Sequence, residues 1–131
     1  MSAELARGID AAEEAALLLA AGKLAGAISR AYYGAFHHAR ALLLTVGEEP
    51  RTHGGLTRLL QANFVRTRRM APEVAALLSR LMTLRQDADY TTERVFTARL
   101  AEDELNDTRT FMAAARAILR EDGWIAEGES P

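Results

Sequence analysis

Apolar residues recur every three or four positions along most of this chain, which is the period of an amphipathic α-helix. The stretch 24–46 has the broadest apolar stripe, which we expect to face a core: Leu24, Ile28, Ala31, Tyr32, Ala35, Ala39, Leu42, Leu43 and Val46. A second stripe on the same helix consists of small and basic residues: Arg30, Gly34, His37, His38 and Ala41. Small residues let another backbone or a ligand come close, so this second face is either a partner surface or a chemical site.

The same spacing predicts four further helices, at residues 3–20, 56–68, 72–88 and 100–120. Glycine and proline fall where these helices should end or begin. Gly47 follows the helix of 24–46, and Pro72 suits the first turn of the fourth helix. Residues 91–97 combine threonines with aromatic and branched side chains, and we interpret them as an extended loop.

The predicted fold class is all-α, an antiparallel helical bundle of four to five helices. Short connections favour antiparallel neighbours, and 131 residues are enough to bury one independent core. We therefore expect a single bundle domain over residues 1–120. Residues 121–131 contain glycines, acids and a proline, which is typical of a flexible C-terminal tail.

Composition limits the classes of chemistry and the location. The chain has no cysteine, which excludes a disulfide framework and thiolate catalysis. No apolar run approaches the ~20 residues that a membrane span requires. The first residues are acidic and amphipathic and lack the apolar core of a signal peptide. We therefore expect a cytoplasmic protein that does not contact a membrane.

The net charge of −2 hides an uneven distribution. Between Pro50 and Pro72 the chain has no acid but carries His53 and five arginines: Arg51, Arg58, Arg66, Arg68 and Arg69. Residues 100–131 instead hold eight acids against three arginines. Two interpretations of the basic segment stay open: a solvated surface balanced by a neighbouring subunit, or a surface that binds an anion or RNA.

The three histidines do not form a metal site in this pattern. His37 and His38 are adjacent in a helix, so their side chains point ~100° apart and cannot chelate one ion together. No carboxylate stands four residues from either of them within the predicted helix. We therefore expect no metal and no cofactor.

Two other clusters could carry chemistry. His53 precedes Gly54 and Gly55 at the start of a helix, where free backbone N–H groups could bind an anion; the alternative is a glycine turn with His53 capping or packing against another helix. Arg85 and Asp89 are four apart in the order that is less favourable within one helix, which suggests contacts to another element. A polar network could join this pair to Tyr33 and His53.

Four segments together resemble the HEPN domain of small stand-alone prokaryotic HEPN proteins: SRAYYGAFHHARALLLTVG, THGGL, NFV and LRQDADY. The resemblance covers about residues 17–119. It implies a helical bundle that forms a homodimer. It also implies a minimal nucleotidyltransferase as partner, since such pairs act as toxin and antitoxin, and a nucleotide or RNA as ligand.

Many HEPN proteins are metal-independent endoribonucleases whose motif is an arginine followed, after four to six residues, by a histidine. Here Arg85 matches the arginine, but Tyr90 occupies the matching place of the histidine. A tyrosine with an unperturbed pKa of about 10 is a poor base at neutral pH. Catalytic residues therefore stay unassigned, with Arg85 and His53 as candidates. The residues expected to bind nucleotide or RNA are Arg30, Tyr33, His53, Arg85, Asp89 and Tyr90.

Two alternatives to a nucleotide- or RNA-binding component remain. The first is a working endoribonuclease that uses His53 or His37 in place of the missing motif histidine. The second is a non-catalytic, dimeric partner-binding bundle, with the face of Arg30, Gly34 and His37 as the dimer seam.

Overall fold

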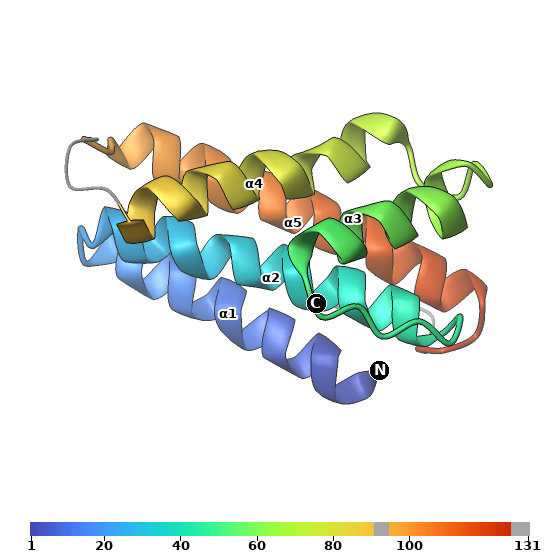
Figure 1. The fold of residues 1–131 in the computed structure, drawn as a ribbon. Helices are drawn as coiled ribbons and strands as arrows, with labels where there is room; N and C mark the ends of the chain where they lie inside the picture. The colour runs from blue at the N-terminus through green and yellow to red at the C-terminus, as the bar shows by residue number, and fades with distance from the viewer. Residues whose placement is uncertain (91–94, 127–131) are drawn as a thin grey trace.

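The second helix, α2 (Leu24–Leu44), runs through the middle of the bundle and contacts every other α-helix. The computed structural model describes residues 1–90 and 95–126 (Figure 1). Around α2 lie α1 (Ser2–Ala20), α3 (His53–Leu60), α4 (Pro72–Tyr90) and α5 (Ala98–Glu121). A π-helical segment, η1 (Gln61–Val65), continues α3. No strand occurs in the described ranges, so the predicted all-α bundle is confirmed.

Two helices, α3 and α5, begin earlier than the spacing of apolar residues predicts, because a capping side chain precedes each of them. Thr52 accepts a hydrogen bond from Gly55 N at 3.0 Å, so α3 begins at His53 rather than at residue 56. Thr97 accepts from Leu100 N at 3.1 Å and starts α5 at Ala98. At the other end of α3 the chain forms η1 and stops at Val65, three residues before the predicted end.

The apolar stripe of α2 forms the centre of the core, as predicted, except at its ends. Ile28, Ala31, Ala35, Leu42 and Leu43 are fully buried. Leu24 is only half-buried, and Val46 lies beyond the end of α2 with 47% of its surface exposed. The buried part of the stripe is therefore about one turn shorter at each end than the stripe in the sequence.

The small-residue face of α2 is covered within the same chain. A Cβ atom on Gly34 would lie 2.9 Å from Thr108 Cγ2 of α5 and 3.5 Å from Ala12 Cβ of α1. A Cβ on Gly8 would lie 2.4 Å from His38 Nδ1. Glycines at these positions let α1, α2 and α5 approach closely. The predicted dimer seam is therefore wrong at Gly34, while the dimer itself stays a prediction.

Polar groups on this covered face bond within the bundle. His38 Nδ1–H donates to Gly34 O at 3.0 Å, and Thr108 Oγ1 donates to Ala31 O at 2.8 Å. Burial lowers the pKa of His38 to about 4, against the bond to Gly34, so its ring is neutral at pH 7. His38 therefore belongs to the packing of the bundle.

Residues 1–90 and 95–126 contain neither a metal-binding cluster nor a membrane-spanning helix. No cluster of three or more His, Cys, Asp or Glu side chains there could hold a metal ion. None of the helices in that part of the chain combines the length and the apolar character that a membrane crossing demands.

Candidate functional site

Arg85 of α4 lies among aromatic side chains of α2. Its Nη1 donates to the Tyr33 hydroxyl at 3.2 Å and to Asp89 Oδ2 at 2.9 Å. The guanidinium carbon lies 5.4, 5.5 and 5.9 Å from the ring centres of Tyr32, Tyr33 and Tyr90. Cation–π contacts of this kind contribute about 0.5–2 kcal/mol each, depending on solvent exposure. The predicted contact of this arginine with another helix is therefore present, and its partner is α2.

Electrostatics keep Arg85 charged and Tyr32 neutral. Burial works against the Arg85 charge, but Tyr33 and Asp89 outweigh it, so the pKa of Arg85 is raised. Burial also raises the pKa of the Tyr32 phenol, and the charge of Arg85 offsets this only in part. The site therefore presents a fixed cation beside the protonated phenol of Tyr32 at physiological pH, which suits binding of a phosphate or a base rather than proton abstraction by this tyrosine.

His53, the first residue of α3, joins the cluster through Tyr32. The Tyr32 hydroxyl lies 3.1 Å from His53 Nδ1, and Thr57 Oγ1 lies 3.4 Å from Nε2. The Thr57 hydroxyl donates its proton to the His53 carbonyl at 3.0 Å, so it accepts from Nε2–H. Nδ1 then accepts from Tyr32. Burial, followed by the charge of Arg85, lowers the pKa of His53. The ring is therefore neutral, and both of its nitrogens are used in contacts within the protein.

The sequence leaves two interpretations of Gly54 and Gly55 open, an anion site and a glycine turn with His53 capping or packing against another helix. Gly55 N donates to Thr52 Oγ1 and Leu56 N to Thr52 O, so these two donors are engaged within the turn. His53 packs against α2 and Thr52 provides the cap. The structure therefore favours the glycine turn.

Tyr33 contacts two arginines. Its ring centre lies 5.0 Å from the guanidinium carbon of Arg30 and 5.5 Å from that of Arg85. Arg30 also approaches Glu14 of α1 at 3.4 Å, and Ser29 Oγ donates to Asp89 at 3.4 Å. The tyrosine ring is thus held by cations from α2 and α4, with its hydroxyl fixed by one of them.

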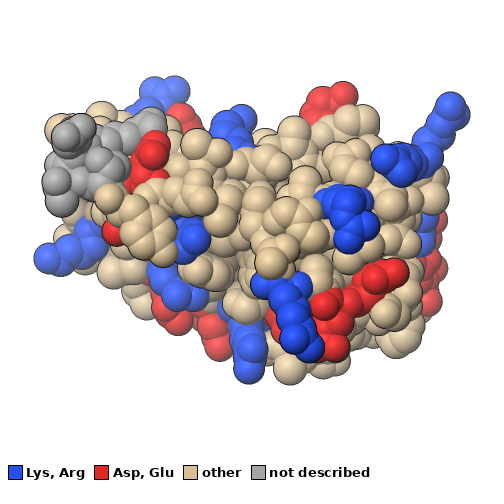
Figure 2. Space-filling model, in the orientation of Figure 1, with Lys and Arg blue, Asp and Glu red and all other residues tan. Residues whose placement is uncertain are grey.

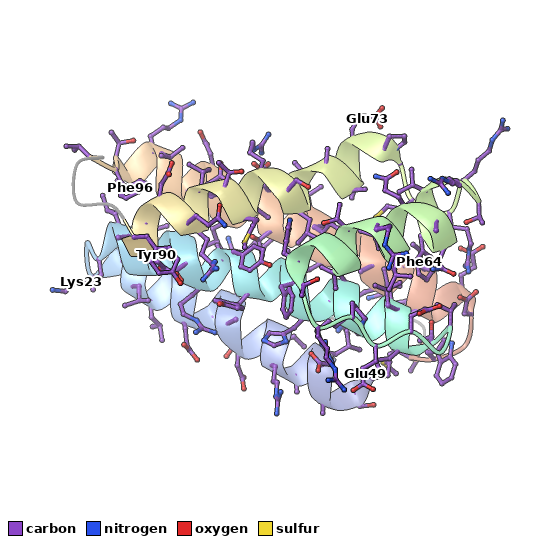
Figure 3. All side chains as sticks on the ribbon, viewed as in Figure 1. Lys23, Glu49, Phe64, Glu73, Tyr90 and Phe96 are labelled. Atoms are coloured by element: carbon purple, nitrogen blue, oxygen red, sulfur yellow. The ribbon has the colours of Figure 1, made fainter. Side chains whose placement is uncertain are left out.

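The six residues predicted to bind nucleotide or RNA fall into one connected group. We call it the arginine–tyrosine cluster, with Tyr32 added: Arg30, Tyr32, Tyr33, His53, Arg85, Asp89 and Tyr90. Tyr90 is 78% exposed at the end of α4 and marks the open side of the cluster (Figure 3). Sequence reasoning assigned Tyr32 to the core alone, although a buried phenol usually needs a hydrogen-bond partner.

A second polar group, the Glu4–His37–Arg40 group, joins the start of α1 to α2. His37 Nδ1–H donates to Glu4 Oε2 at 2.8 Å, and Arg40 Nε lies 3.3 Å from Glu4 Oε1. Arg40 also donates to Pro50 O, in the loop before α3. Burial alone would raise the pKa of Glu4, but His37 and Arg40 together lower it. Glu4 is thus an ionised carboxylate that orients a histidine.

The position of His37 leaves its second nitrogen accessible. Within the described residues Nε2 has no hydrogen bond, and it is not among the enclosed polar atoms. The ring centre is 6.1 Å from that of Tyr33, so this group adjoins the arginine–tyrosine cluster. Sequence reasoning missed Glu4 because it lies 33 residues from His37, on another helix.

The surface over this region is mostly uncharged in its middle, with both basic and acidic side chains at its borders (Figure 2). Partly exposed rings of Tyr33, Phe36 and His37 contribute to it, together with Tyr90. Proteins that bind single-stranded nucleic acids typically combine basic side chains with exposed aromatic rings on which the bases stack.

Comparison with known proteins gives consistent results. Residues 1–118 match the family model described as HEPN domain. The chain is 34% identical over 117 residues to the protein named "Putative toxin MJ0605" from Methanocaldococcus jannaschii, which covers 86% of this chain and 87% of that protein. It is 26% identical over 115 residues to a UPF0332 protein of Thermotoga maritima, covering 88% and 87% of the two chains. A shorter match to the UPF0332 protein PH1297 of Pyrococcus horikoshii is 55% identical over 49 residues, or 37% of this chain and 34% of that protein.

Proposed function

Because this chain belongs to the HEPN domain family, we propose that it is a toxin-like member that binds a nucleotide or RNA at the arginine–tyrosine cluster. Two relatives from Methanocaldococcus jannaschii carry the names "Putative toxin MJ0605" and "Putative toxin MJ0142", and neither name states a ligand. The observation that carries the proposal is Arg85, a fixed cation held by Tyr33 and Asp89 beside the exposed ring of Tyr90.

Each member of the cluster has a distinct role in this proposal. Arg85 and Arg30, which both contact the Tyr33 ring, attract a phosphate. Tyr90 and the exposed edge of Tyr33 stack against a base, which contributes about 1–3 kcal/mol per base at such platforms. Asp89 accepts a hydrogen bond from a base amino group or a ribose hydroxyl. Tyr32 and His53 hold the tyrosine pair against α3.

Arg85→Ala tests this function directly. It removes the cation and its contacts, so we expect affinity for a short, labelled oligoribonucleotide to fall at least about tenfold, or roughly 1.4 kcal/mol. Fluorescence anisotropy at low salt measures this loss. Arg7→Ala is the matched control, since Arg7 is an exposed arginine of α1 and should leave affinity unchanged. Equal affinities of wild type and Arg85→Ala would refute the assignment.

We further propose that the chain is a homodimer that acts with a minimal nucleotidyltransferase. The support is the family membership and the toxin names of two relatives. Sedimentation of the purified chain, alone and after co-expression with a nucleotidyltransferase encoded beside it, tests both statements. A monomer that does not co-purify with such an enzyme would contradict them.

The Glu4–His37 contact favours endoribonuclease activity as a second candidate function. In that reaction His37 Nε2 would take the proton of a ribose 2′-OH, and the oxygen would bond to the adjacent phosphorus. The bond from phosphorus to the 5′ oxygen would break, and water would supply the proton for that oxygen. Glu4 holds the required tautomer by accepting from Nδ1–H, as carboxylates do for catalytic histidines.

Incubation of RNA with the protein in EDTA tests this second function. We expect a 2′,3′-cyclic phosphate product whose formation is lost in His37→Gln and reduced in Glu4→Gln. Arg7→Ala should cleave like wild type, because Arg7 is an exposed arginine of α1 that belongs to neither polar group. Intact RNA, or cleavage that survives His37→Gln, would remove this candidate.

A further inference from the structure

Arginines in this bundle differ in how their charge is balanced. Six form ion pairs with acids: Arg30, Arg40, Arg69, Arg80, Arg85 and Arg99. Arg116 and Arg120 also have interaction partners. Over residues 1–90 and 95–126, six others form no ion pair: Arg7, Arg51, Arg58, Arg66, Arg68 and Arg109. Four of these six lie within residues 51–68, in the segment that contains no acid.

These four arginines form what we call the arginine edge: Arg51, Arg58, Arg66 and Arg68. All four side chains are exposed. Arg51 precedes His53, which contacts Tyr32 of the arginine–tyrosine cluster. From there α3 and η1 form one continuous helical segment of about 20 Å, and Arg66 and Arg68 follow its far end. Basic side chains are visible over α3 and at the end of the bundle where η1 lies (Figures 1 and 2). The edge thus begins at the cluster and leads away from it.

The backbone at Arg68 adds an independent observation. Its φ is +64°, the left-handed conformation that other turns of this chain give to Gly22, Gly47 and Gly123. The turn is closed by bonds from Arg69 N and Met70 N to Phe64 O, at 2.8 and 3.0 Å. An arginine here strains the backbone where glycine would not. The side chain is therefore present at a position that the local backbone does not favour.

Surface composition distinguishes the possible partners of this edge. The large apolar residues that are exposed in the described ranges belong to segments other than α3 and η1: Leu17, Val46, Tyr90, Val95 and Trp124. A protein interface usually has an apolar or aromatic centre, which α3 and η1 do not offer. A series of free arginines without such a centre instead suits the regularly spaced phosphates of a nucleic acid.

We propose that the arginine edge binds the phosphate backbone of single-stranded RNA that extends from the arginine–tyrosine cluster along α3 and η1. This inference rests on the proposed function, because the cluster supplies the stacking contacts and the edge supplies the charge. Arginines that bind phosphates release counterions, so affinity depends steeply on salt. Longer RNA should reach more of the edge and bind more tightly.

The test compares labelled oligouridylates of about 3 and about 12 nucleotides, chosen to bracket the site sizes of single-strand binders. The variant carries Arg58→Ala, Arg66→Ala and Arg68→Gly. Glycine relieves the strained backbone at position 68, so we expect an unchanged or higher Tm together with weaker RNA binding. The control carries Arg7→Ala and Arg109→Ala. These two exposed arginines lie on α1 and α5 and form no ion pair within residues 1–90 and 95–126.

For wild type and control we expect the longer oligomer to bind at least about tenfold tighter. For the edge variant this advantage should vanish, and the slope of log K against log salt should fall by about 0.7 per lost contact. Binding of the short oligomer should stay the same, since it depends on Arg85.

Each outcome separates the edge from the cluster. Short-oligomer binding that depends on Arg85, without any gain from length, would overturn the edge and leave the proposed function standing. A length advantage that the edge variant loses, with no effect of Arg85→Ala, would support the edge and overturn the cluster. Polyglutamate that binds as tightly as the long oligomer would overturn the assignment to RNA.

Discussion

The two faces of α2 make an instructive comparison, because residues one position apart serve different purposes. Gly34 and His38 belong to the face that packs against α1 and α5, where side chains are small or neutral and fully enclosed. Tyr33 and His37 belong to the face toward α4, α3 and the start of α1, where rings meet arginines and a carboxylate. The first face sets the distances between helices. The second face holds polar groups at defined positions near solvent.

Gly34→Leu should have the largest effect, and it should act on stability alone. The new side chain would meet Thr108, Ala12 and the Gly8 carbonyl, so we expect a loss of at least about 3 kcal/mol in the free energy of unfolding. Urea denaturation measures it. Gly54→Ala is the matched control: nothing lies within 4 Å of the added methyl group, so stability should be unchanged or slightly higher. A stable Gly34→Leu variant would contradict the close packing of this face.

Acid should destabilise the packing face through His38. Its folded pKa of about 4 lies below the usual 6.5, so the unfolded chain takes up the proton first as pH falls. Stability from this group is therefore full above pH 6.5 and declines as the pH falls toward 4, by up to roughly 3 kcal/mol. Comparing urea midpoints at these two values, we expect His38→Gln to show a smaller acid loss than wild type. Equal pH dependence in both proteins would show that His38 is not the group responsible.

Tyr32→Phe, on the face of α2 toward α3 and α4, should have a smaller effect on stability. This change removes the hydroxyl that donates to His53 Nδ1 and should cost about 1 kcal/mol. Without that bond to the neutral ring, the pKa of His53 should rise toward its ordinary value. NMR titration of the His53 ring measures the rise. Tyr90→Phe, at an exposed position, should change neither quantity; an unchanged pKa in Tyr32→Phe would contradict the assigned hydrogen bond.

Helices were predictable because burial imposes the 3.6-residue period on every one of them. The predicted helices at 3–20 and 72–88 differ from α1 and α4 by two residues or fewer at each end. The errors at α3 have local causes. Thr52 accepts a hydrogen bond from Gly55 N, so α3 begins three residues before its predicted start. After Leu60 the chain becomes π-helical in η1, which departs from the α-helical spacing used for the prediction. Part of the predicted loop, residues 91–94, and the last part of the predicted tail, residues 127–131, lie outside the described residues.

The candidate site was predictable only where its members lie close in sequence or in a shared motif. Arg85, Asp89 and Tyr90 occupy one helix end, and the unfavourable order of Arg85 and Asp89 indicated a contact outside that helix. Glu4 had no such signal, because its contact with His37 depends on how α1 packs against α2. The same limit applies to Gly34: a stripe of small residues predicts a close approach without saying which element makes it.

NMR titration of the ¹⁵N-labelled protein with a short oligouridylate tests the central claim most directly. If the arginine–tyrosine cluster binds RNA, amide signals of residues 29–37 and 85–90 should shift progressively, and Arg85→Ala should abolish these shifts. Signals from α5 at residues 109–114, which contribute no residue to the cluster, should remain in place. Shifts confined to α1 or α5, or the same shifts in Arg85→Ala, would contradict a nucleotide- or RNA-binding role for this face of α2.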